Sequence, residues 1–308
     1  MNAGKHTPYM AEMLVAVAMF FYGISFVATK IALEVYNPIT IVTMRNIISG
    51  VLLLTVLLIK EGRKGLPRRA HVKVLLLVAF FQPFIYFLGE TYGISMVEAS
   101  VASIIIATIP VFSPLIVRFF YDEGLSKYNY IGLICSFIGV ALIIFSSRDV
   151  HGAAVRPLGI VLLFIAVLAA VGYSIVVKKS PSYLSALSIT SMQNCMGALL
   201  FIPFFLVFGL EETSAASPSF WPVASIIFLA VFPSSVSFLF MNYGIRKIGP
   251  TRTLVFANLV PAVTAVSSFI ILDEVFTSMK LLGMAVILAG VILSQKKRVH
   301  IEEQIIPR

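Results

Sequence analysis

The sequence predicts an all-α polytopic membrane protein with ten transmembrane helices, arranged as two inverted repeats of five helices with both termini in the cytoplasm. The first observation behind this prediction is composition: 59% of the 308 residues are apolar, only 12% are charged, and the mean hydropathy is +0.99. Soluble proteins contain about 45–50% apolar and about 25% charged residues. So few charges cannot cover a water-exposed surface, which excludes a soluble enzyme, a disordered chain, a coiled coil and a nucleic-acid-binding module.

Ten apolar runs supply the predicted helices. A bilayer core about 30 Å thick requires about 20 mostly apolar residues per helix. Runs of that kind lie at residues 10–31, 39–59, 73–93, 98–118, 129–146, 157–177, 184–208, 222–243, 251–272 and 279–295. The connections are too short for a folded soluble domain. The first run is too long for the apolar part of a signal peptide and no small-residue cleavage site follows it, so we expect it to be retained as a span.

The positive charges predict the orientation of these helices, because lysine and arginine accumulate in cytoplasmic connections. With a cytoplasmic N-terminus, 18 of the 23 Lys and Arg residues fall on the inner side and only Arg148, Arg156 and Lys280 on the outer side. Lys30 and Arg45 lie within spans. Both termini are therefore expected inside the cell. The net charge of +9 then reflects positive segments beside anionic headgroups, and not a surface for nucleic acid.

The two halves of the chain repeat each other. At an offset of 151 residues the matched positions are Tyr92-Gly93-Ile94 with Tyr243-Gly244-Ile245, Pro110 with Pro261, Asp122-Glu123 with Asp273-Glu274, Gly132 with Gly283, and Gly139-Val140 with Gly290-Val291. A weaker match near offset 149 pairs Gly23 with Gly172 and Ser25 with Ser174. These matches predict a first repeat at 10–146 and a second at 157–295, followed by a short basic cytoplasmic tail at 296–308.

Five helices per repeat is an odd number, so the second repeat is expected to enter the membrane in the opposite sense. Inverted repeats can exchange conformations and thereby open a central cavity first to one side of the membrane and then to the other. This arrangement predicts a secondary transporter that works by alternating access.

The order of motifs also resembles a known family. The first half contains Phe21-Tyr22-Gly23, Tyr92-Gly93-Ile94, the small-residue segment 98–103, Ile109-Pro110-Val111-Phe112, Asp122-Glu123 and Gly132 to Gly139-Val140; the second contains Leu259-Val260-Pro261-Ala262, Asp273-Glu274 and Gly283 to Gly290-Val291. Together they resemble two tandem EamA domains of the drug/metabolite transporter superfamily, over about residues 12 to 295. The resemblance implies a ten-helix carrier with cytoplasmic termini that usually exports amino acids or other small metabolites. It also implies a cavity among helices 1, 3, 4, 6, 8 and 9.

Pro110 and Pro261 lie about a dozen residues into the fourth and ninth predicted spans, near the membrane midplane at a rise of about 1.5 Å per residue. A proline within a helix removes a backbone hydrogen bond and frees a carbonyl, which a bilayer tolerates where the carbonyl faces protein or water. Because both repeats place a proline at the same point, we expect paired hinges beside the substrate. Static kinks that serve packing are the alternative.

Ionisable residues within spans are costly and therefore mark functional sites. Lys30, Arg45 and Glu90 all lie in the outer third of their predicted spans. We expect them to form one charge cluster that gates the outer mouth or holds a zwitterionic substrate. Glu90 could instead carry a proton or make a structural bond, and Lys30 and Arg45 could extend to the membrane surface.

Polar side chains at membrane depth predict the cavity wall. Gln82, Tyr86 and Glu90 recur every four residues on one face of the third predicted helix, and Tyr22, Ser25 and Asn258 add polar groups from the first and ninth. We expect all six to contact substrate or line the cavity. Gln193 and Asn194 are expected to bond between helices. The aromatic residues that could complete the wall are Phe20, Phe21, Tyr22, Tyr86, Phe87, Phe238 and Tyr243.

Paired glycines predict close contacts between helices. Gly89 and Gly93 lie four residues apart, a spacing that allows a neighbouring helix to approach. Gly132 with Gly139, and Gly283 with Gly290, are each seven apart and lie on one helix face. These two pairs predict packing seams. The seams either join the halves of the chain or form a homodimer interface.

No enzymatic site is predicted, because all four histidines lie in tails or connections and no nucleophile motif or metal-ligand cluster is present. Without a phosphate-binding loop, transport must use a gradient, and no cofactor or metal is expected. The partners expected are a small-molecule substrate and the lipid bilayer of the cell (inner) membrane. A neutral, aromatic cavity favours amino acids or amphiphilic compounds, with export as the expected direction. Sugar-phosphate or nucleotide-sugar antiport is the alternative, followed by a passive channel.

Overall fold

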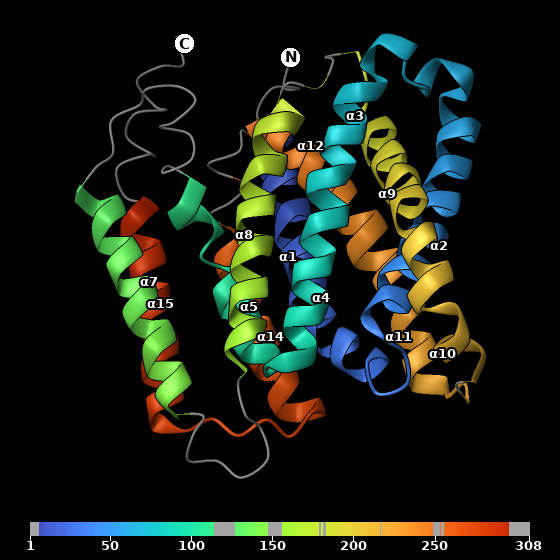
Figure 1. Cartoon of the computed structure of the whole chain (residues 1–308). Coiled ribbons are helices and arrows are strands. Elements are labelled where there is room, and N and C mark those ends of the chain that lie inside the picture. Colours follow the sequence, from blue (N-terminus) through green and yellow to red (C-terminus); the bar gives the residue numbers. More distant parts are fainter. Residues whose placement is uncertain are drawn as a thin grey trace, which may run out of the picture.

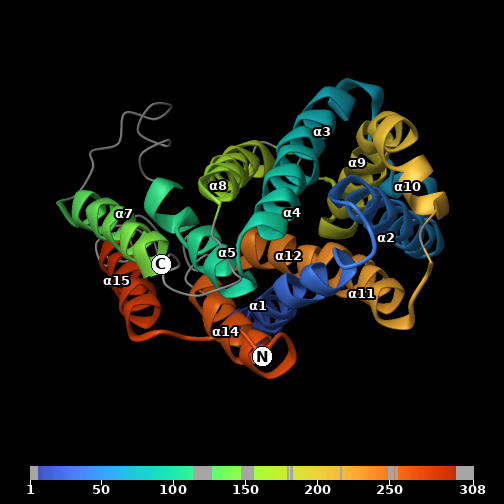
Figure 2. The same ribbon diagram turned by 60° about the horizontal axis from the view of Figure 1, so that its bottom comes forward.

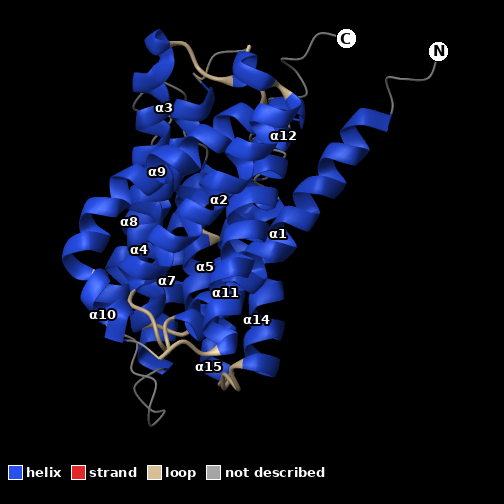
Figure 3. Cartoon of the chain, turned by 90° about the vertical axis from the view of Figure 1, so that its right-hand side faces the viewer, coloured by secondary structure: helices blue, strands red, loops and turns tan. Residues whose placement is uncertain are grey.

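The apolar runs of the sequence form helices. A computed structural model describes residues 6–113, 127–146, 156–178, 180, 183–215, 217–248, 253 and 256–295. Its regular elements are all helices, and the described residues include no strand (Figure 3). The last five residues of the fourth predicted span, 114–118, and parts of the ninth lie outside this description. The prediction of an all-α protein is therefore confirmed for the part of the chain that the structure describes.

The elements of the first half are α1 (His6–Ala32), α2 (Pro38–Lys60), the 3-10 turns η1 (Gly62–Gly65) and η2 (Arg69–His71), α3 (Val72–Ala79), the π-helix η3 (Phe80–Ile85), α4 (Tyr86–Met96), α5 (Ala99–Ile106) and α7 (Lys127–Ser146). Those of the second half are α8 (Pro157–Lys178), α9 (Ala186–Phe208), α10 (Leu210–Ala215), α11 (Phe220–Val231), the π-helix η4 (Phe232–Ser237), α12 (Phe238–Ile248), the 3-10 turn η5 (Phe256–Asn258), α14 (Leu259–Ile271) and α15 (Ser278–Gln295).

Seven helices in the described part of the chain are long and apolar enough to cross a membrane. They are Tyr9–Ala32, Pro38–Lys60, Gly62–Met96, Lys127–Phe145, Pro157–Val177, Ala186–Phe208 and Phe220–Ile248. Three further apolar helices are shorter: Ala99–Ser113, Phe256–Ile271 and Ser278–Ser294. Many large apolar side chains on these helices, such as Ile134, Leu199 and Val266, are exposed. Such surfaces are stable in lipid and not in water.

Local capping explains where two of the long helices begin. The Oδ1 atom of Asn37 accepts a hydrogen bond from Thr40 N at 2.8 Å, and Pro38 occupies the first position of α2, where no N–H is needed. Ser185 caps α9 in the same way, because its Oγ accepts from Ser188 N at 2.9 Å. Short polar connections therefore suffice to end one helix and start the next.

The bundle has two distinct ends. Helix α1 begins and α15 ends at the upper end in Figure 1, which we call the terminal end. The connections at residues 33–37, 97–98 and 272–277 lie at the opposite end, which we call the distal end; it faces the reader in Figure 2. Helix α5 therefore runs from the distal end inward, and α14 runs back toward it.

Helices of the first half pack against helices of the second. Helix α2 packs on α9, α4 on α8, and α7 on α15, whereas α1 packs on α11, α12 and α14. In Figures 1 and 2, α7 and α15 lie side by side at one edge, and α2, α9 and α10 lie at the other. Between these edges, the largest of four clusters of buried apolar side chains among the described residues draws its members from both halves.

The glycine seams join the two halves within one chain. A Cβ atom added to Gly132 would lie 2.6 Å from the carbonyl oxygen of Gly290, and one added to Gly139 would lie 2.6 Å from that of Gly283. Contacts this short exclude any side chain. Of the two alternatives left open by the sequence, these glycines therefore serve the α7–α15 contact. Gly89 and Gly93 likewise let α4 approach α8, as expected.

Prolines interrupt helices at four points, and the sequence anticipated two of them. Pro110 follows a break at residues 107–108, and Pro261 lies in the first turn of α14, directly after η5. Both prolines thus sit at the start of a helical segment, where the missing N–H costs nothing, and not within a continuous helix as expected. The other two interruptions are the π-helices η3, with Pro83, and η4, with Pro233.

A bulky side chain at the α7–α15 seam should destabilise the protein. We expect Gly139→Leu to lower the melting temperature of the detergent-solubilised protein, because overpacking a tight contact costs about 1–3 kcal/mol. Ala289→Leu is the matched control, since Ala289 lies on the exposed face of α15. Equal melting temperatures for the two variants would contradict the seam.

Candidate functional site

A cavity of about 120 Å³ lies in the middle of the bundle. Its lining comes from both halves, and comprises Met19, Tyr22, Ser25, Phe26, Arg45, Gln82, Tyr86, Phe87, Glu90, Ile106, Ala107, Ile109, Ala170, Tyr173, Ser174, Phe238, Met241, Ile245, Ala257 and Val260. These residues belong to α1, α2, η3, α4, α5, α8, α12, η5 and α14, or to the break after α5. Three of the four helix interruptions, at Gln82, at 107–108 and before α14, contribute to this wall.

Five of the six side chains predicted to contact substrate line the cavity. Tyr22 and Ser25 come from α1, and Gln82, Tyr86 and Glu90 from η3 and α4. Gln82, Tyr86 and Glu90 thus face the same cavity, although the backbone at Gln82 is not helical (φ −148°, ψ 116°).

Asn258 is the exception. Its neighbour Ala257 and Val260 line the cavity, whereas Asn258 itself does not. Its buried Oδ1 has no hydrogen-bond partner among the described residues. Asn258 ends the turn η5, so its side chain does not follow the continuous helical face from which its position was predicted.

Arg45 is the positive group of the cavity, and it is 2% exposed. Its Nε donates a hydrogen bond to Ser234 Oγ at 3.0 Å, and its guanidinium carbon lies 3.9 Å from the centre of the Phe87 ring. Its Nη1 is 3.9 Å from Glu90 Oε2. Because the planar guanidinium carries five N–H groups, these contacts leave donors that can receive a substrate anion.

Glu90 is the negative group, and its position is set by its own helix. Tyr86, one turn earlier on α4, donates its hydroxyl hydrogen to Glu90 Oε1 at 2.9 Å. Glu90 is 6% exposed, and its other oxygen faces Arg45. Removing two charges from water is costly unless each has a partner, and Arg45 and Glu90 provide partners of opposite charge for each other.

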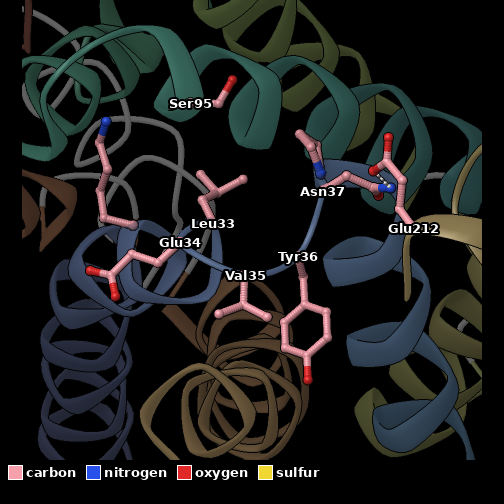
Figure 4. A pocket seen from close by; sticks show the side chains of 9 residues that line it. Leu33, Glu34, Val35, Tyr36, Asn37, Ser95 and Glu212 are labelled. Carbon is pink, nitrogen blue, oxygen red and sulfur yellow. Dashed lines mark hydrogen bonds between the residues drawn. The ribbon is translucent and has the colours of Figure 1, made fainter. Parts of the chain in front are cut away.

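Lys30 does not join this pair. It lies in the last turn of α1 and lines a separate hollow of about 480 Å³ at the distal end, together with Glu34, Ser95 and Glu212. Figure 4 shows Ser95 across this hollow from the 33–37 connection, where Asn37 Nδ2 donates to Glu212 Oε2 at 2.5 Å. The expectation of one cluster of Lys30, Arg45 and Glu90 is therefore wrong for Lys30, because the lysine lies further toward the distal end than the cavity.

Aromatic rings form most of the remaining wall. The rings of Tyr22 and Phe238 are 5.9 Å apart, those of Phe87 and Phe238 are 6.1 Å apart, and those of Tyr86 and Phe87 are 5.7 Å apart. Ligand pockets usually have volumes of about 300–1,000 Å³. The cavity, at about 120 Å³, is smaller than this range and suits a small ligand.

Comparison with known proteins places this architecture in a family. The model of the EamA-like transporter family matches the chain twice, at residues 9–145 and 157–295. The chain belongs to the EamA-like transporter family. It is therefore a multi-pass membrane transporter and not an enzyme.

Relatives agree with this assignment. The chain is 25% identical over 291 residues to an uncharacterized transporter of Bacillus subtilis (strain 168), YetK, covering 94% of this chain and 87% of YetK. It is 25% identical over 288 residues to an uncharacterized transporter of Archaeoglobus fulgidus, covering 92% of this chain and 98% of that protein. One crystal structure matches this fold with a TM-score of 0.66 and 14% sequence identity. The match covers 92% of this chain and 98% of the other chain, which shows that the two proteins share a fold.

Behind the cavity of this EamA-family transporter, a buried polar network holds Arg45 in place. Ser234 in η4 accepts from Arg45 through its hydroxyl, and its carbonyl accepts from Ser49 Oγ and from Asn194 Nδ2, each at 3.1 Å. The hydroxyl of Tyr173 lies 3.0 Å from Gln193 Oε1 and 3.1 Å from Asn242 Oδ1. Asn194 and Gln193 thus make the interhelical bonds expected of them.

Ser234 is a residue of this network that was not predicted from the sequence. A π-helix has irregular backbone hydrogen bonding, which makes the Ser234 carbonyl available to partners on α2 and α9. One feature of the sequence could have indicated the interrupted helix around Ser234. Pro233 lies in the middle of an apolar run, at nearly the same place in its repeat as Pro83. Among the described residues, no group of three or more His, Cys, Asp or Glu is placed to hold a metal ion.

The Arg45–Glu90 pair should contribute strongly to stability. We expect Glu90→Gln and Arg45→Gln each to lower the melting temperature, because removing one member of a buried pair costs about 3–5 kcal/mol. The double variant should recover part of the loss, since it leaves no unpaired charge. Additive losses in a double-mutant cycle would show that the two side chains do not interact.

Proposed function

We propose that this protein is a secondary transporter that exports a small zwitterionic or amphiphilic metabolite, such as an amino acid, across the cell (inner) membrane by alternating access. The observation that carries the proposal is the Arg45–Glu90 pair, which faces an aromatic cavity built from both halves of the chain. A zwitterion can give each of these charges a partner, and the aromatic wall can cover an apolar side chain.

The proposed architecture is ten transmembrane helices in two inverted repeats of five, with both termini in the cytoplasm. It is supported by the two family matches and by the excess of Lys and Arg on the terminal side. The three shorter helices, Ala99–Ser113, Phe256–Ile271 and Ser278–Ser294, would complete the ten spans. In this orientation the terminal end is cytoplasmic and the distal end faces outward.

Impermeant thiol labelling in intact cells should distinguish the two ends. In a background with Cys135 and Cys195 replaced by alanine, we expect Glu34→Cys at the distal end to be labelled. Lys64→Cys at the terminal end should be labelled only after the cells are opened. Both positions are exposed or partly exposed, and labelling of both from outside would contradict the topology.

Sugar-phosphate or nucleotide-sugar antiport is the weaker alternative. Such substrates carry two or more negative charges, whereas Arg45 is the one cation among the described lining residues and Glu90 already balances it. A second phosphate oxygen would therefore face a carboxylate or an aromatic ring. Net repulsion of this kind disfavours polyanions.

Counterflow in proteoliposomes tests the substrate class directly. Vesicles loaded with an unlabelled compound should accumulate the labelled compound transiently if the protein is a carrier, and a passive channel would not produce this overshoot. We expect amino acids to support counterflow and sugar phosphates to fail. The reverse result would establish the alternative.

Glu90→Gln should impair counterflow by about tenfold or more while the protein is still expressed, because a hydrogen bond to a charged group is worth about 1.5–3 kcal/mol. Glu34→Gln is the matched control, since Glu34 is exposed in the distal connection and lies outside the central cavity. Wild-type rates in the Glu90 variant would remove this carboxylate from substrate binding.

A further inference from the structure

A carboxylate of the second half caps a helix of the first half at the distal end. The first N–H groups of a helix have no partner within that helix, and Glu98, which precedes α5, makes no capping bond with its own side chain. Glu274 makes these bonds instead. Its Oε1 accepts from Ala99 N at 2.7 Å, and its Oε2 accepts from Ser100 N at 3.3 Å and from Ser100 Oγ at 2.5 Å.

The backbone beyond α14 is shaped to deliver this carboxylate. Asp273 has a positive φ of 51°, a conformation that non-glycine residues adopt rarely and at some cost. The turn is closed by Ser268, whose carbonyl accepts from Leu272 N at 3.0 Å and from Glu274 N at 3.3 Å. Glu274 is consequently 9% exposed and points across to α5.

Lys280 adds a buried ion pair to the same contact. Its Nζ is 2.7 Å from Glu98 Oε2 and 3.7 Å from Glu274 Oε2. It also donates to Val275 O at 3.3 Å and lies 4.4 Å from the centre of the Phe276 ring. Lys280 is 3% exposed, so it is held by these contacts and is not a free surface charge. We call Glu98, Ser100, Glu274 and Lys280 the distal latch.

The latch ties together the distal ends of two helices whose other ends reach the cavity. Helix α5 packs against α14. At the inner end of α5, Ile106 and Ala107 line the cavity, and at the inner end of α14, Val260 does so. Both inner ends adjoin a helix interruption. A distal opening of the cavity between α5 and α14 would separate the two ends that Glu274 and Lys280 hold together.

The two repeats differ at the sequence positions that correspond to this ion pair. At the offset of 151 residues, Glu274 corresponds to Glu123 and Ser100 to Thr251, so the residue types of the cap recur in the sequence; Glu123 and Thr251 lie outside the described residues. Lys280, however, corresponds to Asn129, and Glu98 corresponds to Gly249. The Lys280–Glu98 ion pair is therefore a feature of the distal side that the matched positions of the first half do not repeat in the sequence.

We propose that the distal latch is the gate on the distal side of the cavity, and that its ion pair keeps this side closed while substrate enters from the terminal side. The proposal rests on the alternating-access function proposed above. With the terminal end in the cytoplasm, a closed distal side allows the transporter to load from inside the cell, as an exporter requires. Opening to the distal side breaks the Glu274 cap and the Lys280 ion pair.

Accessibility of the cavity tests the gate without any knowledge of the substrate. Ser25→Cys, in a background with Cys135 and Cys195 replaced by alanine, provides a single thiol in the cavity wall. We expect a small impermeant thiol reagent, applied from the distal side, to label it slowly. Adding Lys280→Met should raise the labelling rate by about tenfold or more, since a lost charge-assisted contact shifts an equilibrium by this factor.

Two variants separate gating from a general loss of stability. Lys280→Arg keeps the charge and should restore slow labelling, whereas Glu98→Gln removes the ion pair at the more exposed partner and should raise the rate as Lys280→Met does. Melting temperatures identify any variant that is merely unfolded. Wild-type labelling rates in both Lys280→Met and Glu98→Gln, with folding intact, would overturn the gate.

Cross-linking tests whether the latch must open during transport. Ser100→Cys with Glu274→Cys can be joined by a short, reducible bifunctional thiol reagent. We expect linking to lower counterflow well below that of the same double variant after reduction, in which the Glu274 carboxylate is still missing but α5 and α14 can separate. Full counterflow in the linked protein would show a static cap and overturn the gate while leaving the transport function intact. Absence of counterflow in the parent protein would instead count against the proposed function, and the labelling rates would still decide the gate.

Discussion

Every polar group that this chain carries into the bilayer needs a partner within the protein, because lipid offers no hydrogen bonds. This constraint explains the arrangement around the cavity. Arg45 is held by Ser234, Phe87 and Glu90, and Glu90 is held in turn by Tyr86. The interrupted helix at η4 supplies the carbonyl that receives Ser49 and Asn194. The site therefore contains one positive and one negative side chain, Arg45 and Glu90, whose charges balance each other and which both have hydrogen-bond partners within the protein.

The same need for hydrogen-bond partners determines where helices can be interrupted within the membrane. Broken backbone is tolerated at membrane depth only where it is buried in protein or lines a cavity, and three of the interruptions here adjoin the cavity. Close packing supports them from outside: glycines at the α7–α15 and α4–α8 contacts bring helices together through their backbones. The tightly packed helix pairs α7–α15 and α4–α8 surround a centre where other helices are interrupted. Two alternative conformations can then differ mainly at the interruptions, while each helix pair stays intact.

Much of the site could be predicted from sequence because its signals are local. The stripe Gln82, Tyr86 and Glu90 depends only on helical periodicity and survives the break at Gln82. Asn258 and Lys30 were misplaced because their positions depend on where a helix bends or ends. Ser234 was missed because an ordinary serine gains its role from the altered backbone around it. The α5 partners of Glu274, and the Glu98 partner of Lys280, lie about 175 residues or more away along the chain, a separation at which periodicity carries no information.

By itself, the sequence determined the helical class, the membrane environment and the existence of two related halves, because composition, run length and an internal repeat are properties of the chain alone. Only the tertiary structure decided which helices of the two halves meet, that Arg45 rather than Lys30 faces Glu90, and that Glu274 caps α5. The physical reason is that a helix in lipid needs apolar side chains along its length, and this property can be read directly from the sequence. Contacts between helices are selected by the shape and hydrogen bonding of residues distant in sequence.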